Sequence, residues 1–324
     1  MIFHLISRYN FLFLSKRKSH EINEIQHMKF KGYIFGLLSS IAYGLIPLFI
    51  LPIKQENFSI DTTLFYRFFF SAIIVATYLI IKKQSFKISI NQIPSLIVLG
   101  ILYGVSADAL FLAYDYLSAS IASTLLFVYP LIVALIMAIF FKEKITISTI
   151  IAIIFVLTGV FLLSFTDGEF KLNPIGLGIV FISALGYALY IIVINKSKAK
   201  EIKGFTLSFY SFLFTIIYYA IKMIFLKQSF ALPSINMAFN FFTFAFVTTV
   251  ISSIALIYAI KNIGSTATSI LGAFEPVVAV AISVILFGEH FNINLGLGII
   301  MIILGVILNV VGDAYQQNRK KIKS

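Results

Sequence analysis

The stretch Thr268–Phe291 reads TSILGAFEPVVAVAISVILFGEHF, and its composition indicates how the whole chain folds. Nearly every residue between its ends is apolar or small, which is typical of a helix that crosses the hydrocarbon core of a bilayer, about 30 Å thick. Glu275 and Pro276 nevertheless stand in its middle. An ionised carboxylate at that depth costs about 3 kcal/mol, and a proline removes a backbone hydrogen bond from the helix. This pair therefore requires surroundings other than lipid.

The whole chain shares this apolar character. Of its 324 residues, 60% are hydrophobic and 12% are charged, and the mean hydropathy is +1.01. A soluble domain of this length needs more polar residues to cover its surface. The apolar residues form ten blocks of about 19–24 residues, each long enough to span a bilayer. We therefore expect an all-α integral membrane protein with ten transmembrane helices. The blocks lie at 31–50, 62–82, 93–114, 119–141, 147–166, 174–194, 206–226, 236–260, 265–287 and 293–313.

The net charge of +12 is distributed by side of the membrane. Of the 25 lysines and arginines, 20 fall in the two tails and in the alternate loops that share their side. An excess of Lys and Arg marks the cytoplasmic side, so we expect both termini to be cytoplasmic. A basic surface split into loops in this way predicts a lipid partner and no nucleic-acid partner. The bias toward Ile, Lys, Asn and Phe indicates an AT-rich genome and favours a bacterial inner membrane.

The second half of the sequence repeats the first. SIASTLLFVYPLIVALIMAIFFKEKI (120–145) aligns with TATSILGAFEPVVAVAISVILFGEHF (266–291) at an offset of 146 residues. Near the start of each half the matches follow an offset of 144 residues. Matches at Pro, Gly, Glu and Tyr in the same order are stronger evidence than alignment of apolar residues alone. The matched pairs include Pro130 and Pro276, Glu143 and Glu289, Gly159 and Gly305, Tyr43 and Tyr187, and Ser39 and Ser183.

Each half contains five of the predicted spans, and an odd number forces the two halves to insert with opposite orientation. Many secondary transporters use such inverted repeats for alternating access. We expect one five-helix repeat at 29–170 and the other at 171–313. A cytoplasmic tail at 1–28 and a basic cytoplasmic tail at 314–324 flank them. Met28 directly precedes the first span and is an alternative start of the protein.

These features resemble the EamA-type branch of the drug/metabolite transporter superfamily. In both halves, small polar residues precede a proline, and a long apolar run, an acidic residue and a glycine-bearing helix follow it. The resemblance extends over about residues 29–313 and is carried by the whole pattern. It implies a ten-helix fold and solute transport, commonly the export of metabolites or amino acids. The first 28 residues and the absence of tryptophan depart from the pattern.

The helix that contains Glu275 presents a small, polar face. Thr268, Gly272 and Glu275 are spaced to share one side of a continuous helix, which we expect to face the bundle. Pro276 leaves the carbonyl of Gly272 without its usual N–H partner. We therefore expect Glu275 to face a solute cavity. The alternative is a structural carboxylate that caps a neighbouring helix or holds a fixed ion pair.

The first half has a matching interruption at Pro130, which leaves the carbonyl of Leu126 without its N–H partner. Interrupted helices at corresponding positions of two repeats indicate a binding site near the bilayer midplane. Tyrosines on the inner faces can orient a solute there by their hydroxyl groups. The tyrosines that we expect to do so are Tyr43, Tyr129 and Tyr187.

Three further charged residues lie within the predicted spans. Asp108 is a second carboxylate expected to face the bundle, either as a pathway residue or as a satisfied polar group, and it shares with Glu275 the prospect of binding a coupled proton. Arg67 lies about 7 Å inside the second span, so it either reaches the headgroups or contacts a substrate carboxylate. Lys222 is nearer its helix end, and we expect it to reach the headgroups.

Catalytic motifs are absent from the sequence. The four histidines lie in predicted tails or loops, and no HExxH, GxSxG or phosphate-binding loop occurs. We therefore expect a secondary active transporter, an exporter or exchanger of a small metabolite, amino acid or drug-like solute. We expect no enzyme activity, metal or cofactor. The alternatives are a non-transporting scaffold or sensor and an intramembrane lipid-modifying enzyme. The sequence does not set the oligomeric state.

Overall fold

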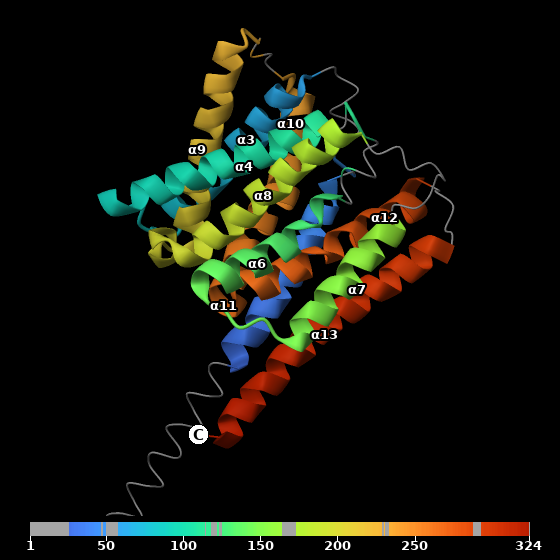
Figure 1. Ribbon diagram of the computed structural model, residues 1–324. Coiled ribbons are helices and arrows are strands. Elements are labelled where there is room, and N and C mark those ends of the chain that lie inside the picture. The colour runs from blue at the N-terminus through green and yellow to red at the C-terminus, as the bar shows by residue number, and fades with distance from the viewer. Residues whose placement is uncertain are drawn as a thin grey trace, which may run out of the picture.

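The computed structural model describes residues 26–46, 48–49, 58–113, 115–117, 122, 125–163, 173–228, 230, 233–287 and 293–323. Every regular element of these residues is a helix (Figure 1). The predicted all-α class is therefore confirmed for the described part of the chain. Residues 1–25 of the predicted tail at 1–28 lie outside it, and so does Glu289.

The helices of the first half are 26–44, α3 (Ile60–Ile81), α4 (Ile93–Ala113) with the short 3₁₀ helix η1 (Ile90–Gln92) before it, α6 (Tyr129–Phe141) and α7 (Ile147–Leu163). The second half contains α8 (Pro174–Lys196), the 3₁₀ helix η2 (Lys198–Glu201), α9 (Gly204–Phe225), α10 (Ile235–Phe244), the π-helix η3 (Ala245–Ile251), α11 (Ser252–Gly272), α12 (Phe274–Phe287) and α13 (Ile293–Lys323). Each predicted block contains at least part of one of these helices. Helix α13 continues through most of the predicted C-terminal tail.

Five helical segments of the described residues are long and apolar enough to cross a membrane: Ile60–Ile81, Ile90–Ala113, Pro174–Lys196, Gly204–Phe225 and Ile235–Gly272. Shorter apolar helices lie at Tyr129–Phe141, Ile147–Leu162 and Ile293–Asn309. The longest segment is bent, because Gly264 has φ 84° and ψ 173° inside α11. Glycine tolerates this backbone conformation, which other residues rarely adopt. The bend falls between the predicted blocks 236–260 and 265–287.

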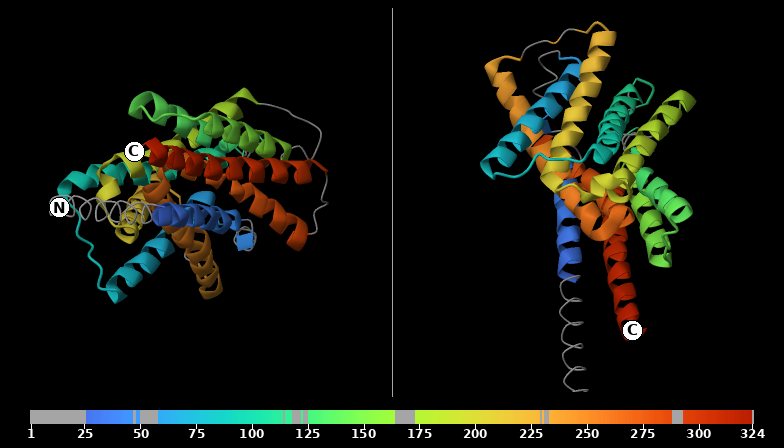
Figure 2. Two further views of the ribbon diagram at one scale, coloured as in Figure 1. Left: turned by 90° about the horizontal axis from the view of Figure 1, so that it is seen from below. Right: turned by 90° about the vertical axis from the view of Figure 1, so that its left-hand side faces the viewer.

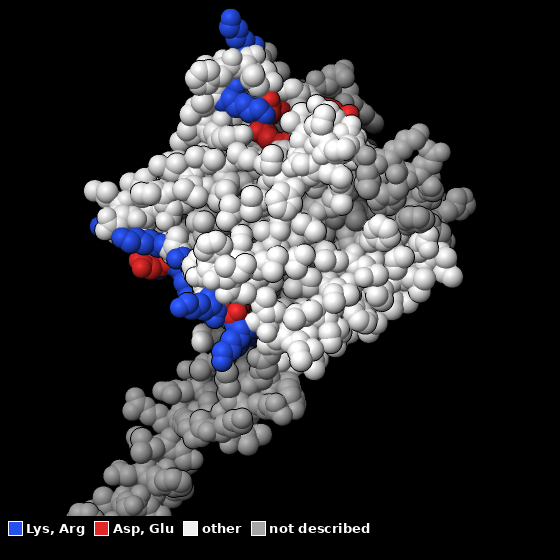
Figure 3. Space-filling model, viewed as in Figure 1, with Lys and Arg blue, Asp and Glu red and all other residues white. Residues whose placement is uncertain are grey.

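The outer surface of the helices suits lipid. Ile139, Phe140, Phe225 and Ile285 are all more than two-thirds exposed. Figure 3 shows the charged side chains gathered toward two ends of the molecule, with a wide uncharged belt between them. A belt of exposed apolar side chains bounded by charges is the surface that a bilayer requires. The chain is an integral membrane protein.

Helices α7 and α13 lie side by side and run antiparallel (Figures 1 and 2). A side chain at Gly159 would strike the carbonyl of Gly298, and one at Gly305 would strike the carbonyl of Ala152. The offset of 146 residues converts one contact into the other. Small residues let the two backbones approach closely, as they do in many membrane helix pairs.

A second pair of contacts is also related by the repeat of the two halves. The hydroxyl of Ser39 donates to the carbonyl of Ser252 at 2.9 Å, and the hydroxyl of Ser183 donates to the carbonyl of Ser106 at 2.6 Å. Ser39 corresponds to Ser183, and Ser106 corresponds to Ser252. In both cases a serine of one half binds a carbonyl of the other half. Contacts that occur in such reciprocal pairs are expected when two similar halves are related by a twofold axis.

The antiparallel pair α3 and α9 has corresponding contacts of different chemistry at its two ends. At one end the ring of Tyr78 stacks on that of Phe205, with the centroids 4.2 Å apart. At the other end Lys222 forms an ion pair with Asp61 at 2.7 Å. The offset of 144 residues carries Tyr78 to Lys222 and Asp61 to Phe205. The two halves therefore keep the geometry of this contact and change its side chains.

Both proline-containing helices are interrupted where the sequence predicts. Helix α11 ends at Gly272, Ala273 forms a turn, and α12 begins at Phe274. In the first half, turn residues 127–128 precede α6. The offset of 146 residues superimposes the two turns. At the second turn the carbonyl of Leu271 accepts a hydrogen bond from the hydroxyl of Ser40 at 2.9 Å, so a side chain of the helix at 26–44 binds the backbone beside the interruption.

Candidate functional site

Six of the ten predicted site residues belong to one cluster in the interior, at the junction of the two interrupted helices. The hydroxyl of Tyr129 lies directly against Gly272, and the ring of Tyr129 lies 4.8 Å from that of Tyr187. Glu275 follows Gly272 across the turn and lies within electrostatic reach of both tyrosines. The other two members are Tyr43 and Arg67. Pro130 and Pro276 lie in the first turns of α6 and α12, beside Tyr129 and Glu275.

Arg67 is buried in the bundle and does not reach the membrane surface. Its side chain leaves α3, and the residue is only 5% exposed. Its Nε donates to the hydroxyl of Thr249 at 2.6 Å, whereas Nη2 has no hydrogen-bond partner among the described residues. The guanidinium lies over three aromatic rings, a cation–π arrangement. These rings belong to Tyr43 at 5.3 Å, Phe68 at 5.8 Å and Phe244 at 5.1 Å.

The partner of Arg67 lies on an unusual backbone. Thr249 belongs to the π-helix η3, which joins α10 to α11. A π-helix is wider than an α-helix and changes the direction in which the following side chains point, and such segments are frequent at functional sites. The sequence showed no signal for this segment. The position of Thr249 beside Arg67 therefore appears only in the structure.

Glu275 occupies the first turn of α12 and is partly buried. Backbone N–H groups at a helix N-terminus favour a negative charge, which helps to explain a carboxylate at this depth. The carboxylate is also within electrostatic reach of Arg67, although the two form no salt bridge. A side chain at Gly44 would strike the carbonyl of Glu275, so the helix at 26–44 packs closely against this turn.

A row of aromatic rings extends from Tyr129 through the interior. The ring centroids of Tyr187 and Tyr190 are 6.3 Å apart, those of Tyr190 and Tyr103 are 5.0 Å apart, and those of Tyr103 and Phe68 are 4.9 Å apart. Tyr103 and Tyr190 were not among the site residues predicted from the sequence. Tyr190 follows Tyr187 by one helical turn, and that spacing was the available signal. The hydroxyl of Tyr190 is buried without a hydrogen-bond partner among the described residues.

Asp108 belongs to a different cluster. Lys222 binds Asp61 at 2.7 Å and Asp108 at 3.0 Å, and the hydroxyl of Tyr218 donates to Asp108 at 2.5 Å. The expectation that Lys222 reaches the headgroups is therefore wrong. Its ammonium group binds two carboxylates that lie far away in the sequence. Tyr219 lies between the clusters, within electrostatic reach of both Asp108 and Arg67.

Thr268 is buried in α11, one turn before Gly272. Its hydroxyl donates to the carbonyl of Gly264 at 2.7 Å, within the bent part of α11. The predicted shared face of Thr268 and Glu275 assumed one continuous helix. The structure has a turn at Ala273 between the helix of Thr268 and the helix of Glu275.

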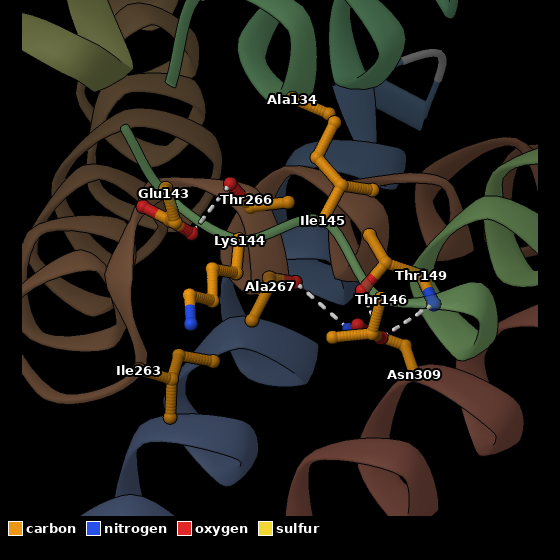
Figure 4. A pocket seen from close by; sticks show the side chains of 10 residues that line it. All are labelled: Ala134, Glu143, Lys144, Ile145, Thr146, Thr149, Ile263, Thr266, Ala267 and Asn309. Atoms are coloured by element: carbon orange, nitrogen blue, oxygen red, sulfur yellow. Dashed lines mark hydrogen bonds between the residues drawn. The ribbon is translucent and has the colours of Figure 1, made fainter. Parts of the chain in front are cut away.

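A small polar pocket of about 80 Å³ lies apart from these residues, where the loop after α6 meets α11 and α13 (Figure 4). Glu143 accepts a hydrogen bond from Thr266 at 3.1 Å, and Asn309 donates to the carbonyl of Ala267 at 3.3 Å. None of the predicted site residues lines the pocket. The described residues also contain no group of three or more His, Cys, Asp or Glu side chains that could hold a metal ion.

Comparisons with known proteins agree with this architecture. The model of the EamA-like transporter family matches residues 30–165 and again residues 174–311. An uncharacterized transporter from Clostridium kluyveri is 26% identical over 304 residues, which cover 90% of this chain and 97% of the relative. An uncharacterized transporter from Archaeoglobus fulgidus is 29% identical over 172 residues, or 52% of this chain and 56% of the relative. A crystal structure described only as that of a protein has a similar fold, with a TM-score of 0.75 at 13% identity over 86% of this chain and 96% of that chain.

Proposed function

The chain belongs to the EamA-like transporter family, and on that basis we propose that it is a secondary active transporter. It exports or exchanges a small metabolite, amino acid or drug-like solute by alternating access. The observation that carries this proposal is the meeting of two interrupted helices at a buried cluster that contains Arg67, Glu275 and several tyrosines. Interrupted helices at midplane depth are where secondary transporters bind solutes.

The proposed topology has ten spans in two inverted repeats, with both termini on the cytoplasmic side of a bacterial inner membrane. The reciprocal contacts of Ser39 with Ser252 and of Ser183 with Ser106 support it. So does the antiparallel packing of α7 against α13, because corresponding helices of inverted repeats run in opposite directions. The basic loops support the orientation.

Alternating access requires closed contacts at both ends of the pathway, and the pair α3 and α9 supplies them. The ion cluster of Asp61, Asp108 and Lys222 lies at the proposed external end, and the stack of Tyr78 on Phe205 lies at the proposed cytoplasmic end. Both contacts join one half to the other. Rocking of one half against the other opens one contact while the other stays closed.

Glu275 is the proposed coupling group, with protons as the coupled ion. Asp108 is the weaker candidate, because Lys222 and Tyr218 already bind one of its oxygens. Glu275 forms no ion pair with another of the described residues, and it lies beside the turn between α11 and α12. A scaffold or sensor does not need a buried arginine within electrostatic reach of a carboxylate at a helix interruption. The family also favours a transporter over a lipid-modifying enzyme.

Solute flux in proteoliposomes tests this proposal. The purified protein is reconstituted, and uptake of a panel of metabolites and drug-like solutes is measured with and without a pH gradient. We expect saturable flux of at least one class of solute, and we expect the gradient to change its rate. Empty liposomes and liposomes that contain heat-denatured protein are the controls. Absence of flux for every solute, with protein shown to be folded, would contradict the proposal.

A further inference from the structure

The guanidinium of Arg67 is short of acceptors. A guanidinium carries five N–H donors in a rigid fork, and an unpaired charge in the interior is unfavourable. Nε donates to Thr249 and the side chain also lies within hydrogen-bonding reach of Tyr43, whereas Nη2 is buried without a partner among the described residues. The ion pairs found within the described residues belong to Lys222 and do not include Arg67. The structure thus holds a fixed positive charge with donors that remain unused.

The groups around Arg67 are aromatic rings and hydroxyls. The hydroxyl groups of Tyr43, Tyr103 and Tyr219 are all within electrostatic reach of the guanidinium. Farther along the row of rings, the hydroxyls of Tyr190 and Ser211 are buried and lie within hydrogen-bonding reach of each other. Hydroxyls can donate as well as accept, so the excess of donors in this interior comes from the guanidinium of Arg67. An anionic group with several acceptor oxygens satisfies such a site, whereas a cation does not.

We propose that Arg67 binds a carboxylate group of the transported solute, which is therefore a small organic anion. This inference rests on the proposed transport function and specifies its substrate class. The Nη2 side of the guanidinium donates to the carboxylate, and Thr249 positions the guanidinium through Nε. The row of Tyr187, Tyr190 and Tyr103 provides a wall for a planar apolar part of the solute.

The charges explain why Glu275 is part of the same site. Glu275 lies within electrostatic reach of Arg67, and an ionised Glu275 would balance the charge of Arg67 in the absence of solute. When a carboxylate binds Arg67, the site stays neutral if Glu275 takes up a proton. The other groups that face Glu275 are Tyr43, Tyr129 and Tyr187, and none of them is a second cation. A neutral interior is favoured in a membrane both before and after binding, so anion and proton bind together.

Binding of a matched pair of probes to the purified protein tests the inference. Phenylacetate and phenylacetamide have the same shape and differ in charge, and calorimetry with melting temperature measures their binding. We expect phenylacetate to bind and to raise the melting temperature, and phenylacetamide to bind at least about tenfold more weakly. Arg67→Gln should weaken phenylacetate binding by about 10- to 100-fold, and the exposed-loop control Lys87→Gln should leave it unchanged.

Two further variants keep the test decisive if Arg67→Gln does not fold. Thr249→Val removes the hydrogen bond that orients the guanidinium and should weaken phenylacetate binding a few-fold, because the guanidinium is then held less firmly. Glu275→Gln imitates the protonated carboxyl group and should bind phenylacetate at least as tightly as the wild type, with less dependence on pH. Unchanged phenylacetate binding by Thr249→Val together with weaker phenylacetate binding by Glu275→Gln would overturn the inference.

Equal binding of the two probes, retained affinity in Arg67→Gln, or no binding of any carboxylate from acetate to phenylacetate would also overturn it. These outcomes leave the proposed transport function standing if another solute shows flux in proteoliposomes. Failure of flux for every solute removes the transport function itself. The two failures are therefore distinguishable.

Discussion

The two halves of this molecule use the same contacts to hold the backbone and different side chains where the pathway is expected. Ser39 and Ser183 make corresponding hydrogen bonds to carbonyls of the opposite half. At the two helix interruptions, by contrast, the residue before the proline is Tyr129 in the first half and Glu275 in the second. Shared architecture thus coexists with unequal chemistry.

The ends of α3 and α9 show the same inequality. One end is held by an ion pair between Asp61 and Lys222, and the corresponding end is held by stacked rings of Tyr78 and Phe205. Ionic contacts respond to salt, and aromatic contacts respond little. Two equivalent closures with different chemistry can therefore be opened by different conditions. Substitutions at corresponding positions should reveal which inequalities matter for function.

The largest difference is expected between Glu275→Gln and Tyr129→Phe. The amide preserves the shape of Glu275 and removes its charge and its exchangeable proton, so coupled transport should fall by more than about tenfold in a folded protein. Loss of the Tyr129 hydroxyl should reduce transport only a few-fold. Flux across a range of pH measures both variants. Normal transport by Glu275→Gln at every pH would make this carboxylate a structural residue.

The paired prolines should give the next largest difference. Alanine can restore a backbone hydrogen bond and is the better helix former by about 3 kcal/mol in a soluble helix, and by less in a membrane bundle. Pro130→Ala and Pro276→Ala should therefore melt no lower than the wild type and transport more slowly. Pro276→Ala should be the slower, because Glu275 depends on this turn for its direction. Lower melting temperatures with undiminished transport would show that the prolines only shape packing.

A smaller difference, in stability, is expected between substitutions at the two ends of the α3 and α9 pair. Lys222→Gln leaves Asp61 and Asp108 without their cation and should lower stability by about 1–3 kcal/mol, discounted because the Lys222 side chain is 29% exposed. Tyr78→Leu keeps most of the apolar burial and should cost about 1 kcal/mol. Concentrated salt should reduce the difference between wild type and Lys222→Gln and leave the effect of Tyr78→Leu unchanged. Melting temperatures at two salt concentrations measure this difference. An equal response of the two variants to salt would contradict the ionic and aromatic roles given to the two contacts.

The smallest changes in stability are expected at Ser39 and Ser183, and the two changes should be equal. Ser39→Ala and Ser183→Ala each remove one buried hydrogen bond to a carbonyl of the opposite half, and each should cost about 1 kcal/mol. Corresponding positions in similar surroundings should give similar changes in melting temperature. A difference of more than about 2 kcal/mol between them would show that the two contacts are not equivalent, because single hydrogen bonds rarely differ by more.

Much of the architecture could be predicted from the sequence because a bilayer leaves few choices to an apolar chain. Long apolar runs, their turns and the paired prolines give the helices and their interruptions directly. The site was harder to predict. The depth of Arg67 along its helix was known, but whether the side chain faced lipid or the bundle depends on the rotation of that helix against its neighbours.

The residues missed from the sequence share one property, since their roles depend on distant partners. Lys222 binds Asp61 across 161 positions of the chain, and neither residue stands out locally. Thr249 depends on a π-helix that the sequence did not reveal. Local sequence patterns predict the helices, and the packing of helices against one another decides which side chains meet.

Cross-linking the two ends of α3 and α9 tests the central claim, alternating access between inverted halves, most directly. The chain has no cysteine, so thiols introduced in pairs face no background. One variant carries Asp61→Cys with Lys222→Cys, and the other carries Tyr78→Cys with Phe205→Cys. A short, reducible bifunctional thiol reagent joins each pair, and each variant before cross-linking is its own control. We predict that either cross-link stops solute flux and that reduction restores it. Flux that continues unchanged in both cross-linked variants would contradict the account.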